Sequence, residues 1–304
     1  MSHVPDPIPV AVVGGRGFLG RAITEELERV GHRALVLERE TPALTPAGLA
    51  EEVMISDTVV WAASSINPMI SANDPVRVEA DIDAFGAFVK AVADLPRPPR
   101  ILLLSSGGTV YDQHAQPPYT ESSPTVPASD YGRAKLALEH RLAAADETLV
   151  LRVANAYGPG QPLAPGQGVI AHWMTALLAG HTPHLYGDPD RARDYVYVAD
   201  IAAAVRAAVE TEDWPVPVLN VGSGVPTSLG RLYELVRDAA GAVGVEPHRH
   251  PVRDYDAPST WLDCDLAADT IGWRARTPLP DGLAAAWRHL VASTPAPHLP
   301  ETPR

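Results

Sequence analysis

Residues 10–20 read VAVVGGRGFLG, and this stretch decides the fold. The apolar run VAVV is typical of a buried parallel strand. Three glycines follow at G-x-x-G-x-x-G spacing (Gly14, Gly17 and Gly20), and a helical pattern follows them. A strand, a glycine-rich turn and a helix in this order bring backbone N–H groups close to a pyrophosphate at the helix N-terminus. The stretch therefore predicts a βα unit that binds a dinucleotide.

A carboxylate stands where the ribose of that dinucleotide is expected. A second strand, Ala34 to Leu37, ends at Glu38, about 20 residues beyond the glycine turn, as is usual in dinucleotide-binding units. A carboxylate there accepts hydrogen bonds from the ribose hydroxyls and repels a 2′-phosphate, so NAD is favoured over NADP. Arg39 beside it is able to hold that phosphate, so the preference is not absolute.

Tyr131 and Lys135 form a candidate catalytic pair. A tyrosine and a lysine at this spacing lie on one face of a helix, one turn apart. A free tyrosine has a pKa near ~10, and a nearby ammonium group favours the phenolate form. The pair could therefore transfer protons near neutral pH.

Four further segments follow in order along the chain: ILLLSSGGTVY at 101–111, LRVANAYGPGQ at 151–161, RDYVYVAD at 193–200 and LNVGSG at 219–224. Together with the glycine turn and the Tyr/Lys pair, they resemble the extended short-chain dehydrogenase/reductase family. The resemblance is to its NAD-dependent epimerase/dehydratase branch, which acts on nucleotide sugars, and it covers most of the chain.

The resemblance implies an α/β fold, a Rossmann-type doubly wound parallel sheet with a smaller C-terminal substrate-binding α/β domain. We expect residues 1–154 to form the NAD-binding domain, with 184–210 returning to it, and residues 155–292 to be mainly substrate-binding. Residues 293–304 are rich in Pro and Thr and are expected to be a disordered tail. Alternating patterns support a mostly parallel sheet, with further strands at 58–62, 101–105 and 148–153 and helices at 76–95 and 129–145.

The segment after Glu38 departs from the family. Family members usually carry a third strand before the one that begins here at Thr58. We expect that strand to be short or missing, and we predict that Thr45 and Pro46 are the N-cap and first residue of a short helix.

The resemblance also implies a mechanism. NAD would take a hydride from a sugar carbon while Tyr131 takes the hydroxyl proton, and Lys135 would hold the nicotinamide ribose. Return of the hydride to the other face of a keto intermediate makes the enzyme a 4-epimerase. The family places a Ser or Thr opposite the tyrosine, but that position is Gly107 here. Ser106 and Thr109 are the available hydroxyls, and Ser106 is narrowly preferred.

The resemblance gives a set of residues for each ligand. For NAD these are Gly14, Gly17, Phe18, Leu19, Gly20, Glu38, Arg39, Ala62, Ala63, Ser64, Asp81, Ser105, Tyr131 and Lys135. For a nucleotide-diphosphate sugar these are Ser106, Gly107, Tyr131, Asn155, Tyr186, Arg193, Arg253, Asp256 and Thr260.

The resemblance also implies a role for most residues of the substrate set. Asn155 with Arg193 and Arg253 would hold the diphosphate, which suits a bidentate guanidinium. Tyr186 would pack on the nucleotide base, and Asp256 would bind its ribose. In some members a large tyrosine restricts the sugar pocket at the position of Thr260. A small residue there predicts that a UDP-N-acetylhexosamine can be accommodated.

Composition excludes several function classes. The net charge of −13 argues against a nucleic-acid partner. A single cysteine, Cys264, excludes an intramolecular disulfide, and the eleven histidines show no metal-ligand spacing, so no metal is predicted. No apolar run approaches the ~20 residues of a membrane helix, and the first residues lack signal-peptide features. We expect a cytoplasmic protein without a membrane partner, and a homodimer because helices 76–95 and 129–145 resemble the family's dimer interface.

Two other functions remain open. One is a nucleotide-sugar 4-ketoreductase or dehydratase in deoxysugar or antibiotic-sugar biosynthesis. Gly108 and Thr109 stand where a dehydratase usually has acid/base carboxylates, and Glu38 argues mildly against the NADPH that a reductase often prefers. The other is a non-catalytic NAD-binding regulator, which would have no need for the Tyr131/Lys135 pair.

Overall fold

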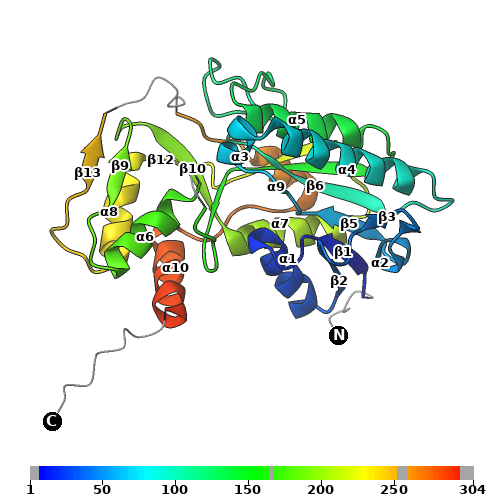
Figure 1. The fold of residues 1–304 in the computed structure, drawn as a ribbon, viewed down its shortest axis with the longest axis horizontal. Helices are drawn as coiled ribbons and strands as arrows, with labels where there is room; N and C mark the ends of the chain where they lie inside the picture. The colour runs from blue at the N-terminus through cyan, green and yellow to red at the C-terminus, as the bar shows by residue number, and fades with distance from the viewer. Residues whose placement is uncertain (1–6, 165–166, 252–258, 295–304) are drawn as a thin grey trace, which may run out of the picture.

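The computed structural model describes residues 7–164, 167–251 and 259–294, and Figure 1 shows how its elements are arranged. Six strands form the central sheet of the larger lobe in the order β11-β7-β6-β5-β1-β2, and every neighbouring pair is parallel. The order reverses between β1 and β5, and in sheets of this kind ligands bind at the carboxyl ends of the strands there. The strands are β1 (Pro9–Val13), β2 (Arg33–Leu37), β5 (Thr58–Trp61), β6 (Arg100–Ser106), β7 (Thr148–Val153) and β11 (Val218–Val221).

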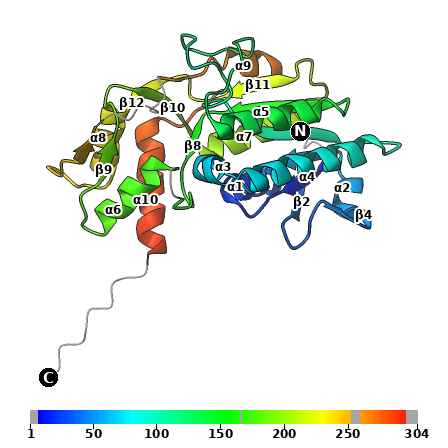
Figure 2. The ribbon, with the colours of Figure 1, turned by 45° about the horizontal axis from the view of Figure 1, so that its top comes forward.

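Helices cover both faces of this sheet (Figures 1 and 2). α1 (Phe18–Arg29) and α7 (Val198–Glu210) pack together on one face, and α4 (Pro75–Ala93) and α5 (Asp130–Leu142) on the other. Because side chains alternate along a strand, β1 supplies both cores. Val10 and Val12 pack with α1 and α7, whereas Ala11 and Val13 pack with α4 and α5. The VAVV run is therefore continuous because both faces of β1 are buried.

The smaller lobe is built on two short sheets. β8 (Asn155–Tyr157), β10 (Ala192–Tyr197) and β12 (Pro226–Ser228) form one, and β9 (His184–Tyr186) pairs with β13 (His248–His250) in the other. Their core is a cluster around Tyr157, Trp173 and Leu283. The helices of this lobe are α6 (Val169–Leu178), α8 (Leu229–Ala239) and α10 (Leu279–Ser293).

The segment after β2 confirms one prediction and overturns another. β2 is the edge of the six-stranded sheet, so the third strand of the family is missing there, as expected. In its place lies a hairpin of two-residue strands, β3 (Leu44–Thr45) and β4 (Gly48–Leu49), followed by α2 (Glu51–Met54). The prediction that Thr45 caps a helix is wrong, because its hydroxyl closes the hairpin turn. That hydroxyl donates to the Gly48 carbonyl at 3.2 Å and accepts from the Ala47 N–H at 3.2 Å.

The predicted fold class is confirmed, with strands and helices close to their expected positions. α5 begins with Ser129 as its N-cap, whose hydroxyl accepts from the Gly132 N–H at 3.1 Å. Two shorter helices, α3 (Pro68–Asn73) and α9 (Asp265–Ile271), complete the described chain. Of the expected C-terminal tail, Ser293 is the last residue of α10, and 295–304 lie outside the described residues.

Candidate active site

One large cleft, of about 2440 Å³, is lined by residues of both lobes. The larger lobe contributes the glycine turn and the carboxyl ends of β5 and β6, and the smaller lobe contributes β8 to β10. The cleft therefore lies where the order of the strands reverses, between β1 and β5. Its size suits a ligand pair, because drug-sized pockets alone span about 300–1,000 Å³.

The glycine turn forms a backbone cradle at the start of α1. Gly14 has a φ of +82°, which other residues rarely adopt, and the Gly17 N–H donates to its carbonyl at 3.0 Å. A Cβ on Gly20 would collide with the same carbonyl, so only glycine lets the helix approach the turn this closely. No side chain among the described residues caps α1, which leaves its first N–H groups open. Gly14, Gly17, Phe18 and Leu19 line the cleft, so the predicted pyrophosphate site fits this cradle.

Glu38 lies at the end of β2, beside the glycine turn. Its side chain is 19% exposed, and Oε2 lies 3.2 Å from Nη1 of Arg16, a residue of that turn. Glu38 and the exposed Arg39 both line the cleft. The position of this carboxylate at the end of β2 is the one that the prediction of a ribose contact requires.

The loop after β5 lines the part of the cleft next to the glycine turn. Ala62, Ala63 and Ser64 line the cleft, and Ala63 packs directly on Gly14. Asp81 of α4 holds this loop, because its Oδ1 accepts from the Ser65 N–H at 2.9 Å. Asp81 also lines the cleft, so its position is consistent with a role near the coenzyme.

Tyr131 and Lys135 lie on one wall of the cleft, on the first turns of α5. Nζ of Lys135 is 5.8 Å from the centroid of the Tyr131 ring, and the lysine side chain is almost fully buried. Gly132 lets α5 approach Thr109 closely, since a Cβ at Gly132 would collide with the Thr109 carbonyl. Gly132 therefore brings the start of α5, with Tyr131, close to the turn that follows β6.

Ser106, the last residue of β6, and the turn that follows it decide which hydroxyl reaches the cleft. Gly107 is buried and does not line the cleft, because a Cβ there would lie 2.6 Å from Leu262 Cδ1 and 2.9 Å from the Arg152 carbonyl oxygen. Ser106, Gly108 and Thr109 do line the cleft. The Thr109 hydroxyl is buried without a hydrogen-bond partner among the described residues, and the Ser106 hydroxyl is neither bonded nor buried there.

A buried ion pair that the sequence reasoning missed lies behind this wall. Glu139 and Arg152 have side chains 6% and 7% exposed, and Nη2 of Arg152 lies 2.7 Å from Glu139 Oε2. The Ser105 hydroxyl donates to Oε1 of the same carboxylate at 2.5 Å, and the Arg152 guanidinium lies 4.8 Å from the Tyr111 ring centroid. Burial is the largest single influence and lowers the pKa of Arg152, but the hydrogen bonds and charge attraction from Glu139 and Tyr111 together outweigh it, so the arginine pKa is raised.

Two sequence signals could have revealed this pair. Glu139 lies four residues after Lys135, on the same helix face, and Arg152 is a charged residue within the apolar strand β7. The pair joins α5, β6 and β7, the three elements that carry Lys135, Ser106 and the substrate loop.

Three predicted substrate residues line the smaller lobe's side of the cleft, namely Asn155, Tyr186 and Arg193. The Asn155 Nδ2 donates to the Asp194 carbonyl at 2.8 Å, which fixes the amide. Tyr186 is 45% exposed and stacks on the His250 ring at 4.2 Å between centroids. Arg253 and Asp256 lie outside the described residues.

Thr260 does not line the cleft. Its side chain is buried, and within residues 7–164, 167–251 and 259–294 its hydroxyl has no hydrogen-bond partner. Its backbone N–H donates to the Ala192 carbonyl at 3.0 Å, which ties it to β10. The structure therefore places Thr260 behind the substrate wall rather than on it.

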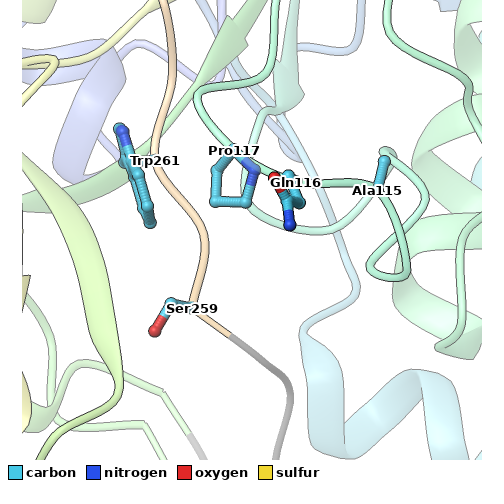
Figure 3. Close-up of a pocket in the computed structure, with 5 residues that line it drawn as sticks. All are labelled: Ala115, Gln116, Pro117, Ser259 and Trp261. Atoms are coloured by element: carbon cyan, nitrogen blue, oxygen red, sulfur yellow. The ribbon is translucent and has the colours of Figure 1, made fainter.

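A smaller cavity, of about 380 Å³, lies apart from these residues. Figure 3 shows Ser259 and Trp261 on one segment and Ala115, Gln116 and Pro117 on the other. Its lining includes none of the predicted site residues. Tyr131, Lys135 and Ser106 line the large cleft instead.

The fold and the site together define an α/β enzyme of the Rossmann class that binds a dinucleotide coenzyme. The chain belongs to the NAD dependent epimerase/dehydratase family, whose family model matches residues 10–222, and its coenzyme is accordingly NAD. Among the described residues, no helix is both long and apolar enough to span a membrane.

Similar proteins include enzymes with different net reactions. A dTDP-6-deoxy-L-talose 4-dehydrogenase (NAD(P)(+)) of Kitasatospora kifunensis is 33% identical, covering 92% of this chain and 95% of the relative. A UDP-glucose 4-epimerase of Mycolicibacterium smegmatis is 30% identical, and the match covers 90% of this chain and 95% of that relative. The solved UDP-glucose 4-epimerase of Thermotoga maritima with UDP-glucose is 27% identical with a TM-score of 0.82, covering 93% of this chain and 98% of that one.

Proposed function

We propose that this protein is a nucleotide-sugar 4-epimerase that acts on a UDP-hexose or a UDP-N-acetylhexosamine through a transient 4-keto sugar. The observation that carries the proposal is one cleft lined by the coenzyme cradle, the Tyr131/Lys135 pair and the open Ser106 hydroxyl. The UDP-glucose 4-epimerases from two bacteria, similar along most of their length, support it.

The chain's own residues would divide the work as follows. Tyr131 would take the proton of the sugar 4-hydroxyl and later return it, and Lys135, whose Nζ lies 5.8 Å from the Tyr131 ring centroid, would hold the nicotinamide ribose. The Ser106 hydroxyl would share the hydrogen bond to the reacting oxygen. The chemistry that NAD supplies when bound is acceptance of a hydride from C4 and its return.

The smaller lobe would hold the nucleotide while the sugar turns. Arg193 and Asn155 would bind the diphosphate, and Tyr186 would pack on the base. Epimerisation requires that the keto sugar turn its other face to the coenzyme. The protein contacts that hold the substrate must therefore lie on the nucleotide and leave the sugar free to rotate. We infer that residues 155–292 serve mainly this purpose, with residues 1–154 holding the coenzyme.

A second candidate is a nucleotide-sugar 4-dehydrogenase or 4-ketoreductase. The specific observation in its favour is the 33% identity to an enzyme named as a deoxytalose 4-dehydrogenase. Such an enzyme releases its coenzyme after each turnover, whereas an epimerase regenerates it in place.

The substrate test compares two sugars on one preparation. Purified protein is assayed with UDP-glucose and UDP-N-acetylglucosamine side by side, without added coenzyme, and the 4-epimer is quantified by chromatography. We expect turnover of at least one of them. Loss of all activity unless NADPH and a 4-keto sugar are supplied would favour the reductase instead. Good turnover of the plain sugar with none of the N-acetylated one would remove the second substrate class.

A further inference from the structure

Three histidines and a tyrosine form a block of stacked rings on the smaller lobe. β9 pairs in parallel with β13, with His184 opposite His248 and Tyr186 opposite His250. Because side chains alternate along a strand, these four rings share one face of the two-stranded sheet. Leu185, on the other face, is buried in the core of the lobe. The sequence patterns His-x-Tyr and His-x-His therefore bring all four rings together.

The ring block has a front layer and a back layer with respect to the large cleft. His184 and Tyr186 of β9 line the cleft, whereas His248 and His250 of β13 do not. Tyr186 is 45% exposed, and the His250 ring lies against it with 4.2 Å between centroids and 13° between planes. The His248 ring stacks on His184 instead, at 5.4 Å. β9 thus presents rings to a ligand, and β13 supports them from behind.

A hydrogen bond fixes the ring that supports Tyr186. Nδ1 of His184 lies 2.7 Å from Nε2 of His250. One of these nitrogens carries the proton and the other accepts it, so at least one of the two rings is neutral. His250 therefore has a face against Tyr186 and an edge bonded to His184. Its ring cannot turn without losing both contacts.

A ring that is already held in place binds a ligand better than a mobile one. An exposed side chain that changes rotamer must be ordered when the ligand binds, and this ordering lowers the affinity. The contact with His250 restricts the Tyr186 ring before any ligand arrives. The side of Tyr186 that lines the cleft remains available to stack on a planar base.

We propose that His250 is a positioning residue for nucleotide binding, which holds the Tyr186 ring ready for the nucleobase without touching the nucleotide itself. The proposal rests on the proposed function, in which Tyr186 packs on the base. It adds β13 to a site that otherwise ends at β9. Loss of the His250 ring should therefore weaken the binding of the nucleotide through Tyr186 alone.

Isothermal titration calorimetry with UDP and with dTDP tests this on the full chain and its variants. His250→Ala removes the supporting ring and is expected to weaken nucleotide binding about 2- to 10-fold, the factor for one aromatic pair. His250→Phe keeps a ring against Tyr186 and should stay within about two-fold of the unchanged protein. His248→Ala is the matched control, because its ring stacks on His184 rather than on Tyr186, and it should leave the affinity unchanged.

A double-mutant cycle distinguishes positioning from general damage to the lobe. Tyr186→Ala removes the ring that meets the base and should weaken binding about 5- to 100-fold, the factor for a base stacked on an aromatic ring. In that background His250→Ala should cause no further loss, because His250 acts through Tyr186. The affinity for NADH should be the same in every variant.

Binding of neither UDP nor dTDP to the unchanged protein would overturn this proposal and the proposed function together. If a nucleotide binds, three results would each overturn the positioning role alone. These are an unchanged affinity in His250→Ala, a loss in His250→Phe as large as in His250→Ala, and the same loss from His250→Ala with and without Tyr186.

Discussion

At the scale of single residues, proton transfer would depend on a phenol and a hydroxyl that reach the same point of the cleft. Tyr131 is held by α5 beside Thr109, and Ser106 ends β6 with its hydroxyl open to the cleft. The position where the family has its Ser or Thr is closed by Leu262 and the Arg152 backbone. We propose that the hydroxyl function has moved along the chain to Ser106 rather than disappeared.

Tyr131→Phe removes only the phenolic oxygen. We expect activity to fall about 10²–10⁴-fold, the usual contribution of a positioned proton-transfer group, with coenzyme content unchanged. Tyr119→Phe is the matched control, because the Tyr119 hydroxyl donates only to the Ala115 carbonyl at 3.3 Å. Full activity in Tyr131→Phe would show that the phenol is not the proton-transfer group.

Ser106→Ala and Thr109→Val distinguish the two hydroxyls. Ser106→Ala should lower kcat about ten-fold or more without loss of stability, because Ser106 lines the cleft and no hydrogen bond within the described structure holds its hydroxyl. Thr109→Val should retain activity and hold or raise the melting temperature, since the Thr109 hydroxyl is buried without a partner in the described structure. The reverse pattern, measured by steady-state kinetics and thermal unfolding, would assign the role to Thr109.

At the scale of elements, the ion pair between Glu139 and Arg152 fixes α5, the helix that carries Tyr131 and Lys135, to the sheet. It joins α5 to β7, and the Ser105 hydroxyl adds β6. Burial also raises the pKa of the neighbouring Tyr111 to about 12, so that phenol stays neutral beside the pair. The pair holds these elements in register, while Tyr131 and Lys135 face the cleft.

Glu139→Gln leaves the Arg152 charge buried without its partner. We expect the free energy of unfolding, measured in urea, to fall by about 3–5 kcal/mol, the usual cost of breaking a buried pair. Asp83→Asn breaks an exposed pair between α4 and α5, with Arg141, and should cost about 0–1 kcal/mol. Equal effects of the two substitutions would mean that the buried pair does not hold α5 in place.

Local patterns were sufficient for the elements that follow simple rules. The VAVV run, the glycine turn and the Tyr/Lys spacing predicted β1, α1 and the face of α5 directly. The prediction of a helix N-cap at Thr45 was wrong, because a threonine hydroxyl can cap a helix or close a turn. Only the pairing of β3 with β4 decides between the two. Gly107 could not be placed from local patterns. The course of the chain after β6 depends on contact with Leu262, which is far away in the sequence.

At the scale of the whole molecule, two lobes with separate cores meet at one cleft. α4 and α5 pack together on one face of the sheet, and α4 exposes small residues there, such as Ala80 and Ala87. Helices 76–95 and 129–145, which correspond to α4 and α5, were the ones expected to form a dimer interface. We propose that two chains associate through this face.

Light scattering at micromolar concentration tests the dimer. We expect a mass twice the 32.3 kDa of one chain. Ala87→Arg should shift it to the monomer by placing a charge in the interface, whereas Val243→Arg, on an 87% exposed loop residue, should not. A monomer in the unchanged protein would contradict this proposal.

The central claim is that the sugar keeps its own C4 hydrogen through epimerisation, because NAD held at the glycine turn would accept that hydrogen as a hydride and return it in place. The direct measurement uses UDP-galactose and UDP-N-acetylgalactosamine, each deuterated at C4, incubated with purified protein and no added coenzyme, with products followed by NMR and mass spectrometry. For at least one of the two sugars we predict the 4-epimer with its deuterium kept at C4, and release of NAD when the protein is denatured. Formation of no epimer, or of an epimer that carries protium at C4, would contradict the account.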